Sequence, residues 1–99
     1  MQYSAAQRKY LRGLAHELEP VVRIGKARVT PEVAAEADRS LEAHELIKVR
    51  IDVEGRDARR ALADDLADRT SSALITSVGK IAVFYRPREE KPKIRLPRE

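Results

Sequence analysis

The stretch VVRIGKARVTPE, residues 21–32, joins an expected strand to an expected helix through a short loop. The β-branched run at residues 21–24 favours a short strand, and Gly25 ends it. Thr30 is a residue type that caps helix N-termini, and Pro31 then occupies the favoured first helical position. The stretch therefore predicts a strand–loop–helix unit, which the neighbouring segments extend in both directions.

N-terminal to this unit, the sequence predicts a helix that begins after Ser4 and ends at Pro20. Ser4 and Gln7 have the spacing of a capping box, in which each side-chain oxygen accepts the other residue's backbone N–H. The apolar residues of this helix recur at i, i+3, i+4 and i+7 and are expected to face the core. They are Leu11, Leu14, Ala15 and Leu18.

C-terminal to the unit, the helix that begins at Pro31 runs to about residue 43, and a further helix spans residues 57–70. Between them residues 46–54, LIKVRIDVE, alternate strictly as a strand does, so one of its faces is expected to meet water. The residues expected in the core are Val33, Ala34, Ala37 and Leu41, then Ile47, Val49, Ile51 and Val53, then Ala58, Ala61, Leu62 and Leu66.

The segment ALITSVGKIAVFYR, residues 73–86, predicts a β-hairpin. Glycine at the first central position, Gly79, is typical of a type II′ turn. That turn pairs Val78 with Ile81, Thr76 with Val83 and Leu74 with Tyr85 on one face, and brings Ile75 toward Phe84 on the other. Because neither face is wholly polar, part of the second face is expected to be covered, with Ile94 and Leu96 as the candidates.

These elements predict the order αβαβαββ in an α+β fold, a single two-layer α/β sandwich around a four-stranded mixed sheet. Strands separated by helices are expected to pair in parallel through right-handed crossovers, and the final hairpin is antiparallel. Residues 1–99 are expected to form one domain, in which residues 86–99 are an extended basic tail.

The composition argues against several classes of protein. The chain has 99 residues, a formal net charge of +4, two histidines and no cysteine, so neither a metal site nor a cofactor is expected. His16 and His44 lie near expected helix C-termini, where capping is the simplest role, and no assembled catalytic site indicates an enzyme. A polar N-terminus and the lack of a long apolar run predict neither a signal peptide nor a membrane contact, so a cytoplasmic protein is expected.

Cations and acids separate along the chain in a way that suggests one basic face. Acids cluster within residues 32–45 and 57–68, whereas cations without local partners lie elsewhere. A basic face is the electrostatic footprint expected for a phosphate backbone. The candidate contacts outside the loop are Arg8, Arg12, Lys48, Arg50, Lys80 and Arg86, for which a solvated charged surface is the alternative interpretation.

The loop itself is the sharpest candidate for an anion site. The N–H groups at a helix N-terminus bind anions, Gly25 lets a ligand approach the backbone, and Lys26 and Arg28 add positive charge. From the residues alone, an ordinary turn with solvated cations is an equal alternative. The spacing is neither that of a nucleotide P-loop nor that of a dinucleotide fingerprint.

Four segments together carry a family resemblance. LRGLAHELEPVVRIGKARVTPEV, LEAHELIKVRI, VGKIAVFYRP and the closing KIRLPR, in this order across residues 4–98, resemble a stand-alone bacterial CRM domain of the YhbY type. CRM abbreviates chloroplast RNA splicing and ribosome maturation. The resemblance implies an RNA-binding domain similar in fold to the C-terminal domain of a bacterial translation initiation factor. Stand-alone members associate with precursors of the large ribosomal subunit.

The resemblance also implies a GxxG loop that contacts the nucleic-acid backbone, as in KH domains. Gly25, Lys26 and Ala27 match its first three positions, but Arg28 stands where the second glycine is expected. If that position needs φ > 0, arginine is strained there by roughly 1 kcal/mol; if it does not, the exchange adds a cation.

The predicted function is therefore a monomeric, non-enzymatic RNA-binding protein whose partner is structured RNA, namely large-subunit rRNA or a pre-ribosomal particle, with no small-molecule substrate. One alternative is a protein-interaction module of the ribosome or translation machinery that uses the acidic helices. Another is a binder of duplex DNA.

Overall fold

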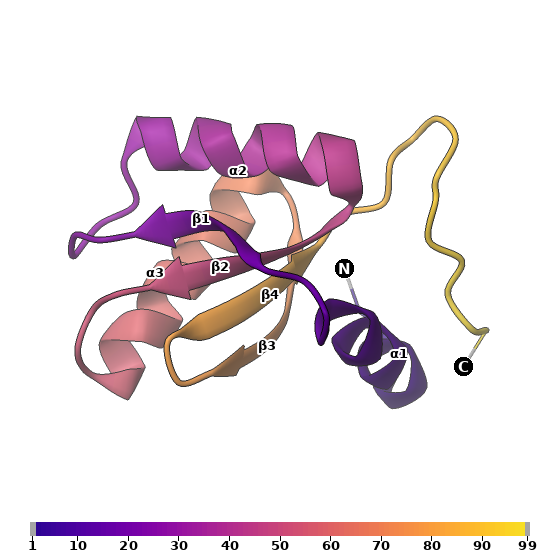
Figure 1. Ribbon diagram of the computed structural model, residues 1–99, viewed down its shortest axis with the longest axis horizontal. Helices are drawn as coiled ribbons and strands as arrows, with labels where there is room; N and C mark the ends of the chain where they lie inside the picture. The colour runs from indigo at the N-terminus through magenta and orange to yellow at the C-terminus, as the bar shows by residue number, and fades with distance from the viewer. Residues whose placement is uncertain (1, 99) are drawn as a thin grey trace.

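The computed structural model describes residues 2–98 and confirms the predicted α+β class and the order αβαβαββ. The elements are α1 (Ala5–Ala15), β1 (Pro20–Ile24), α2 (Pro31–His44), β2 (Leu46–Ile51), α3 (Arg56–Thr70), β3 (Ala73–Val78) and β4 (Ile81–Tyr85). The strands form one mixed sheet in the order β1-β2-β4-β3 (Figure 1). β1 and β2 pair in parallel, whereas β4 is antiparallel to both of its neighbours.

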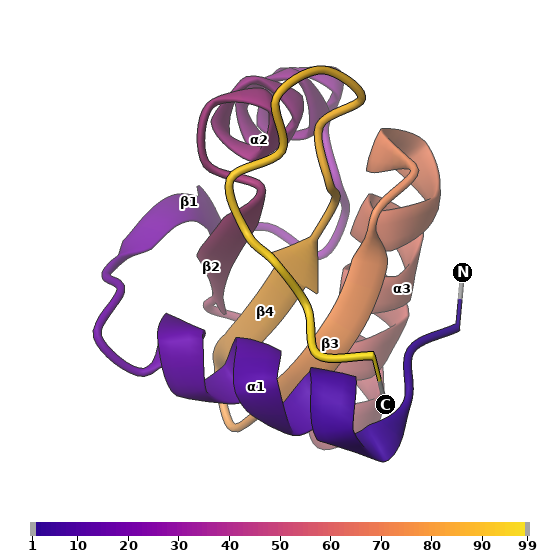
Figure 2. The ribbon, with the colours of Figure 1, turned by 90° about the vertical axis from the view of Figure 1, so that its right-hand side faces the viewer.

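Helices α2 and α3 cover one face of the sheet, so the helices form one of the two predicted layers and the sheet forms the other. Their core includes Ile24, Val49, Leu66 and Phe84, and the last of these is fully buried. On the opposite face a smaller cluster forms beneath α1 and the C-terminal segment, which pass in front of the sheet in Figure 2. Ile94 and Leu96 pack against this cluster and cover the face that carries Ile75, as predicted, but Phe84, predicted on the same face, lies on the other one.

Helix α1 begins as predicted but ends earlier. Ser4 and Gln7 form the capping box, with bonds of 3.0 and 3.1 Å, but the helix stops at Ala15 rather than at Pro20. The predicted burial of Leu14 and Leu18 is wrong, because only Leu11 and Ala15 of that stripe face the sheet and residues 16–19 form the connection to β1.

None of the helices within residues 2–98 is long and apolar enough to cross a membrane.

Helix α2 packs on the core with the predicted residues, whereas α3 differs from the prediction in which residues it buries. Thr30 caps α2 as predicted, and its Oγ1 accepts a bond from the Val33 N–H at 3.2 Å. In α3 the predicted burial of Ala58 and Ala61 is wrong, since both are exposed. The larger Leu62 and Leu66 set the inner face, which is completed by Ala63, Ala67 and Thr70.

The hairpin has the predicted turn but only part of the predicted register. Val78 lies opposite Ile81 and Thr76 opposite Val83, and Gly79 has φ +57° as the turn requires. The pairing of Leu74 with Tyr85 is wrong: an irregularity between Leu74 and Thr76 places Leu74 opposite Phe84.

Because of this bulge, Ile75 points to the α1 side of the sheet and does not meet Phe84. Arg8 Nη1 donates bonds of 3.2 and 3.0 Å to the carbonyl oxygens of Leu74 and Ile75. The Arg8 guanidinium therefore satisfies carbonyl groups at the irregular strand.

Candidate nucleic-acid interface

The loop between β1 and α2 presents two free cations to solvent. Residues 25–28 are all exposed, whereas Val29, which follows them, is 4% exposed and anchors the loop to the core. Within residues 2–98, Lys26 and Arg28 make no hydrogen bond or ion pair. Their charges are therefore available to a ligand without the loss of an internal contact.

The N-terminus of α2 beside this loop has little unused hydrogen-bonding capacity. Pro31 has no N–H, the Val33 N–H bonds the Thr30 side chain, and the Ala34 N–H bonds the Thr30 carbonyl oxygen at 3.0 Å. This leaves the N–H of Glu32, whose own carboxylate lies in the first turn. The loop cations must therefore supply most of the attraction for an anion.

Arg28 occupies its position without backbone strain. The described residues with positive φ are Glu45, Gly55, Ser71, Gly79 and Lys91, so neither Gly25 nor Arg28 is among them. Apart from its two chain neighbours, no residue in the described range 2–98 has an atom within 4 Å of a Cβ added at Gly25. The loop thus does not require glycine at either end for its own geometry, and Arg28 exchanges backbone access for a cation.

Two further predicted residues lie on the polar side of β2. Arg50 is exposed, and its Nε donates to Asp52 Oδ1 at 2.8 Å. Lys48 is half-buried, and its Nζ donates to the His16 carbonyl oxygen at 3.3 Å, where a cation suits the C-terminal end of α1. The predicted wet face of β2 is therefore open at Arg50 but closed at Leu46, which packs in the cluster beneath α1.

The end of the sheet where β1 and β2 finish brings several predicted cations together. The Ile51 N–H bonds the Lys80 carbonyl oxygen at 2.7 Å, and the Asp52 N–H bonds that of Ile24 at 2.8 Å. The hairpin turn, the end of β2 and the start of the loop therefore adjoin one another, at the left of Figure 1. Lys80 itself pairs with Glu54 at 3.2 Å in a solvent-exposed contact.

The remaining predicted residues do not join this group. Arg12 is exposed on α1, and Arg8 is bonded to the β3 carbonyl oxygens. Arg86 is occupied by internal contacts. Its Nη1 donates to Asp38 Oδ1 at 2.6 Å and to the Thr70 carbonyl oxygen at 2.7 Å, and its side chain is 19% exposed. Arg86 therefore ties β4 to α2 and α3.

A buried carboxylate that the sequence prediction missed fixes the C-terminal segment. Glu45 is 0% exposed and accepts bonds from the backbone N–H groups of Arg88 at 2.7 Å, Lys93 at 2.8 Å and Ile94 at 2.9 Å. Burial opposes its ionisation, but these bonds and the charge of Arg88 leave the Glu45 pKa below its usual value. The tail is thus held against the domain, and no local pattern around Glu45 indicates this.

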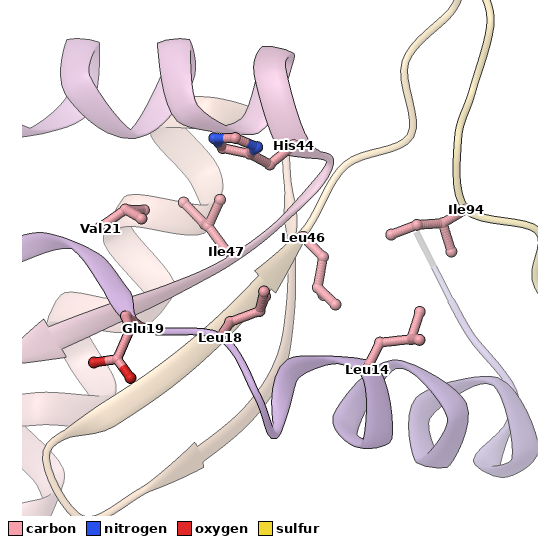
Figure 3. A pocket seen from close by; sticks show the side chains of 8 residues that line it. All are labelled: Leu14, Leu18, Glu19, Val21, His44, Leu46, Ile47 and Ile94. Carbon is pink, nitrogen blue, oxygen red and sulfur yellow. The ribbon is translucent and has the colours of Figure 1, made fainter.

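An apolar groove lies at the other end of β1, with a volume of about 420 Å³. Leu14, Leu18 and Val21 line it with Leu46, Ile47 and Ile94, as Figure 3 shows. Its two polar side chains, Glu19 and His44, come from opposite walls and do not point toward each other. They therefore do not form an acid–base pair across the groove.

Comparisons with known proteins agree with this architecture. Residues 4–86 match the sequence model of the CRS1/YhbY (CRM) domain. A Haemophilus influenzae protein named RNA-binding protein is 41% identical over 96 residues, which cover 97% of this chain and 96% of the relative. A Bacillus subtilis protein named probable RNA-binding protein is 32% identical and covers 92% and 95%. The solution structure of a Staphylococcus aureus hypothetical protein matches with a TM-score of 0.85 and 35% identity, over 97% of this chain and all of that one.

Proposed function

This chain belongs to the CRS1/YhbY (CRM) domain family, and on that basis we propose that it binds structured RNA through the loop between β1 and α2. The RNA is the rRNA of large-subunit precursors, and the protein acts on it in the cytoplasm as a monomer without catalysing a reaction. The proposal for RNA draws on the names of the relatives. The proposal for rRNA draws on the resemblance to stand-alone bacterial CRM proteins.

The observation that carries the proposal is that Lys26 and Arg28 are exposed and have no partner among residues 2–98. A cation that must leave an internal carboxylate partner to reach a phosphate exchanges one anion for another, so its net gain from that phosphate is small. These two cations lose only water. Val29 and the capped start of α2 fix the loop beside them, which reduces the ordering cost on binding.

The proposed contact is with phosphates and does not select a sequence. Phosphate contacts set position and orientation on the nucleic acid, whereas base contacts read its sequence. Preference for structured RNA over DNA would then come from the shape of the A-form backbone and its 2′-hydroxyl groups. The neighbouring cations Arg50 and Lys80 would extend the phosphate track at the same end of the sheet.

The test is a fluorescence-anisotropy titration of a structured large-subunit rRNA fragment and of a matched DNA duplex at several salt concentrations. The Lys26→Glu, Arg28→Glu double variant is compared with an Arg39→Glu, Arg69→Glu control, which makes the same charge change on exposed positions of α2 and α3. We expect tighter binding to RNA than to DNA. The loop variant should weaken RNA binding by roughly tenfold or more. It should also reduce the slope of log affinity against log salt concentration by the equivalent of about one to two phosphate contacts, whereas the control should change affinity and slope much less.

Two results would contradict the proposal: equal effects of the loop variant and the control, or equal binding to RNA and DNA. A pull-down of large-subunit precursors tests the assembly role separately. Association that survives ribonuclease digestion would contradict RNA recognition there and favour the protein-interaction module.

A further inference from the structure

Two arginines and one aspartate form a fixed cluster at the end of β1 and β2. Arg23 lies opposite Arg50 in the parallel register, and the carboxylate of Asp52 receives Nε of Arg23 on Oδ2 and Nε of Arg50 on Oδ1. The side chain of Arg23 is 71% exposed and that of Arg50 is 46% exposed, but that of Asp52 is only 16% exposed. The carboxylate thus lies underneath, and the two guanidinium groups face the solvent.

The cluster occupies a part of the sheet that none of the helices within residues 2–98 covers on the side of the two arginines. Val22, Ile24, Val49 and Ile51 point into the core beneath α2 and α3, so the alternating side chains of Arg23 and Arg50 point to the other face. On that face, α1 lies away from the ends of β1 and β2 that carry the cluster (Figure 1). A ligand that approaches this end of the sheet from the face of the two arginines therefore meets none of the described helices.

The hydrogen bonds within the cluster leave the useful edges of both arginines free. Each guanidinium uses its Nε for Asp52, and neither Nη1 nor Nη2 has a hydrogen-bond partner within residues 2–98. The Nη1–Nη2 edge of arginine presents two parallel N–H donors, which match two oxygens of a phosphate. Because the carboxylate already holds both groups, less side-chain entropy is lost when an anion binds.

The charge of the cluster also favours an anion. Burial opposes ionisation of Asp52, but hydrogen bonds from Arg23 and Arg50 leave the pKa of its carboxyl below the usual value. The cluster therefore carries two positive charges and one negative charge at neutral pH. Arg23 also lies two residues before Gly25, so the cluster adjoins the cationic loop along the chain.

We propose that Arg23 and Arg50 form a second phosphate site. Their outward Nη1–Nη2 edges donate hydrogen bonds to one phosphodiester of the same RNA molecule that contacts the loop. This inference rests on the proposed function, since it names a further contact for the same ligand. The RNA backbone then passes from the loop onto the open face of β1 and β2. Asp52 is a positioning residue that orients both arginines and does not touch the RNA.

The test uses the same rRNA fragment with two double variants of the full chain. Arg23→Gln, Arg50→Gln removes the charge and the forked edges, whereas Arg23→Lys, Arg50→Lys keeps the charge and removes the forks. We expect the glutamine variant to bind RNA roughly tenfold more weakly, with a salt slope lower by about one phosphate. The lysine variant should restore the slope but leave affinity about threefold below that of the unaltered protein.

The thermal midpoint of each variant is measured together with its RNA affinity. If the ion cluster has only a structural role, its removal would lower stability and leave RNA affinity unchanged at temperatures where the protein is folded. That result would overturn the inference. A lysine variant that binds as well as the unaltered protein would overturn the forked contact. If the unaltered protein fails to bind RNA, the proposed function itself fails; if only the loop variant loses affinity, this second site alone is refuted.

Discussion

Replacement of Glu45 by glutamine tests the buried carboxylate that holds the C-terminal segment. Glutamine has nearly the same shape, so packing is preserved, but it turns one acceptor oxygen into an NH₂ donor. The carboxylate accepts three backbone N–H groups, two of them on Oε1 and one on Oε2. The variant keeps at best the two bonds to Oε1 and sets a donor against the Arg88 N–H.

The expected loss follows from these contacts. A hydrogen bond to a charged group contributes about 1.5–3 kcal/mol, and an unsatisfied buried donor costs a further 1–3 kcal/mol or so. Because the segment can partly relax toward solvent, we expect Glu45→Gln to lower the free energy of unfolding by about 2–4 kcal/mol. Urea unfolding gives this value, and hydrogen exchange should show faster exchange at the amides of Arg88, Lys93 and Ile94.

The effect should depend on pH in a defined direction. The folded-state pKa of Glu45 lies below its ordinary value, so its contribution is fully present above about pH 4.3. That contribution is lost as the pH falls through the folded-state pKa. The difference in stability between the unaltered protein and Glu45→Gln should therefore be largest at neutral pH and shrink below about pH 4.

A pair of glycine variants separates the carboxylate from the backbone. Glu45 and Ser71 have φ of +67° and +53°, where glycine relieves strain. Ser71→Gly should be neutral or stabilising by up to about 1 kcal/mol, whereas Glu45→Gly should still destabilise the protein. A loss below about 0.5 kcal/mol for Glu45→Gln, or equal effects of the two glycine variants, would refute the reasoning.

Three more predictions concern other contacts. Arg86→Met should lower the free energy of unfolding by about 1.5–3 kcal/mol, as measured in urea, because the Arg86 guanidinium is bonded to Asp38 and a carbonyl oxygen. The same variant should leave RNA affinity unchanged, and weakened RNA binding by the folded variant would contradict this. Gly79→Ala should cost about 1 kcal/mol because φ is +57°, whereas Gly25→Ala should cost almost nothing, and equal losses would refute the difference in backbone geometry. Burial, with smaller effects of Tyr3 and Glu45, raises the pKa of Tyr85 to about 12, and burial also raises the pKa of Tyr3. Ultraviolet titration should therefore show a tyrosine ionisation near pH 12 that Tyr85→Phe removes, whereas ionisation of all tyrosines near pH 10 would contradict this.

Local patterns were sufficient to predict much of this fold. The Ser4–Gln7 capping box, the Thr30–Pro31 helix start and the Gly79 turn each depend on residues within one turn of chain, and all three are confirmed. Strict alternation placed Ile47, Val49 and Ile51 correctly in the core.

The prediction failed where distant contacts decide the local structure. Arg8 bonds carbonyl groups 66 and 67 residues away at the bulge that shifts Leu74, and Glu45 binds amides 43 to 49 residues away. No short-range pattern contains those partners.

The same distinction applies to the candidate site. The composition of the loop predicted exposed cations, and Lys26 and Arg28 have no partner in the part of the chain that the structure describes. For Arg86 the sequence could not reveal that carboxylates and carbonyl groups of other elements surround it. Arg23 was missed although it alternates with Val22 and Ile24, a pattern that marks it as an outward-facing cation on a strand.

The central claim is that the loop between β1 and α2 contacts RNA phosphates. The most direct test is to record amide chemical shifts by NMR while the protein is titrated with the structured rRNA fragment. The account predicts that the largest shifts fall on residues 25–28 and on the Glu32 amide, and that they are suppressed by salt as the binding is. Shifts concentrated on the outer faces of α2 and α3, with residues 25–28 unchanged at saturation, would contradict it.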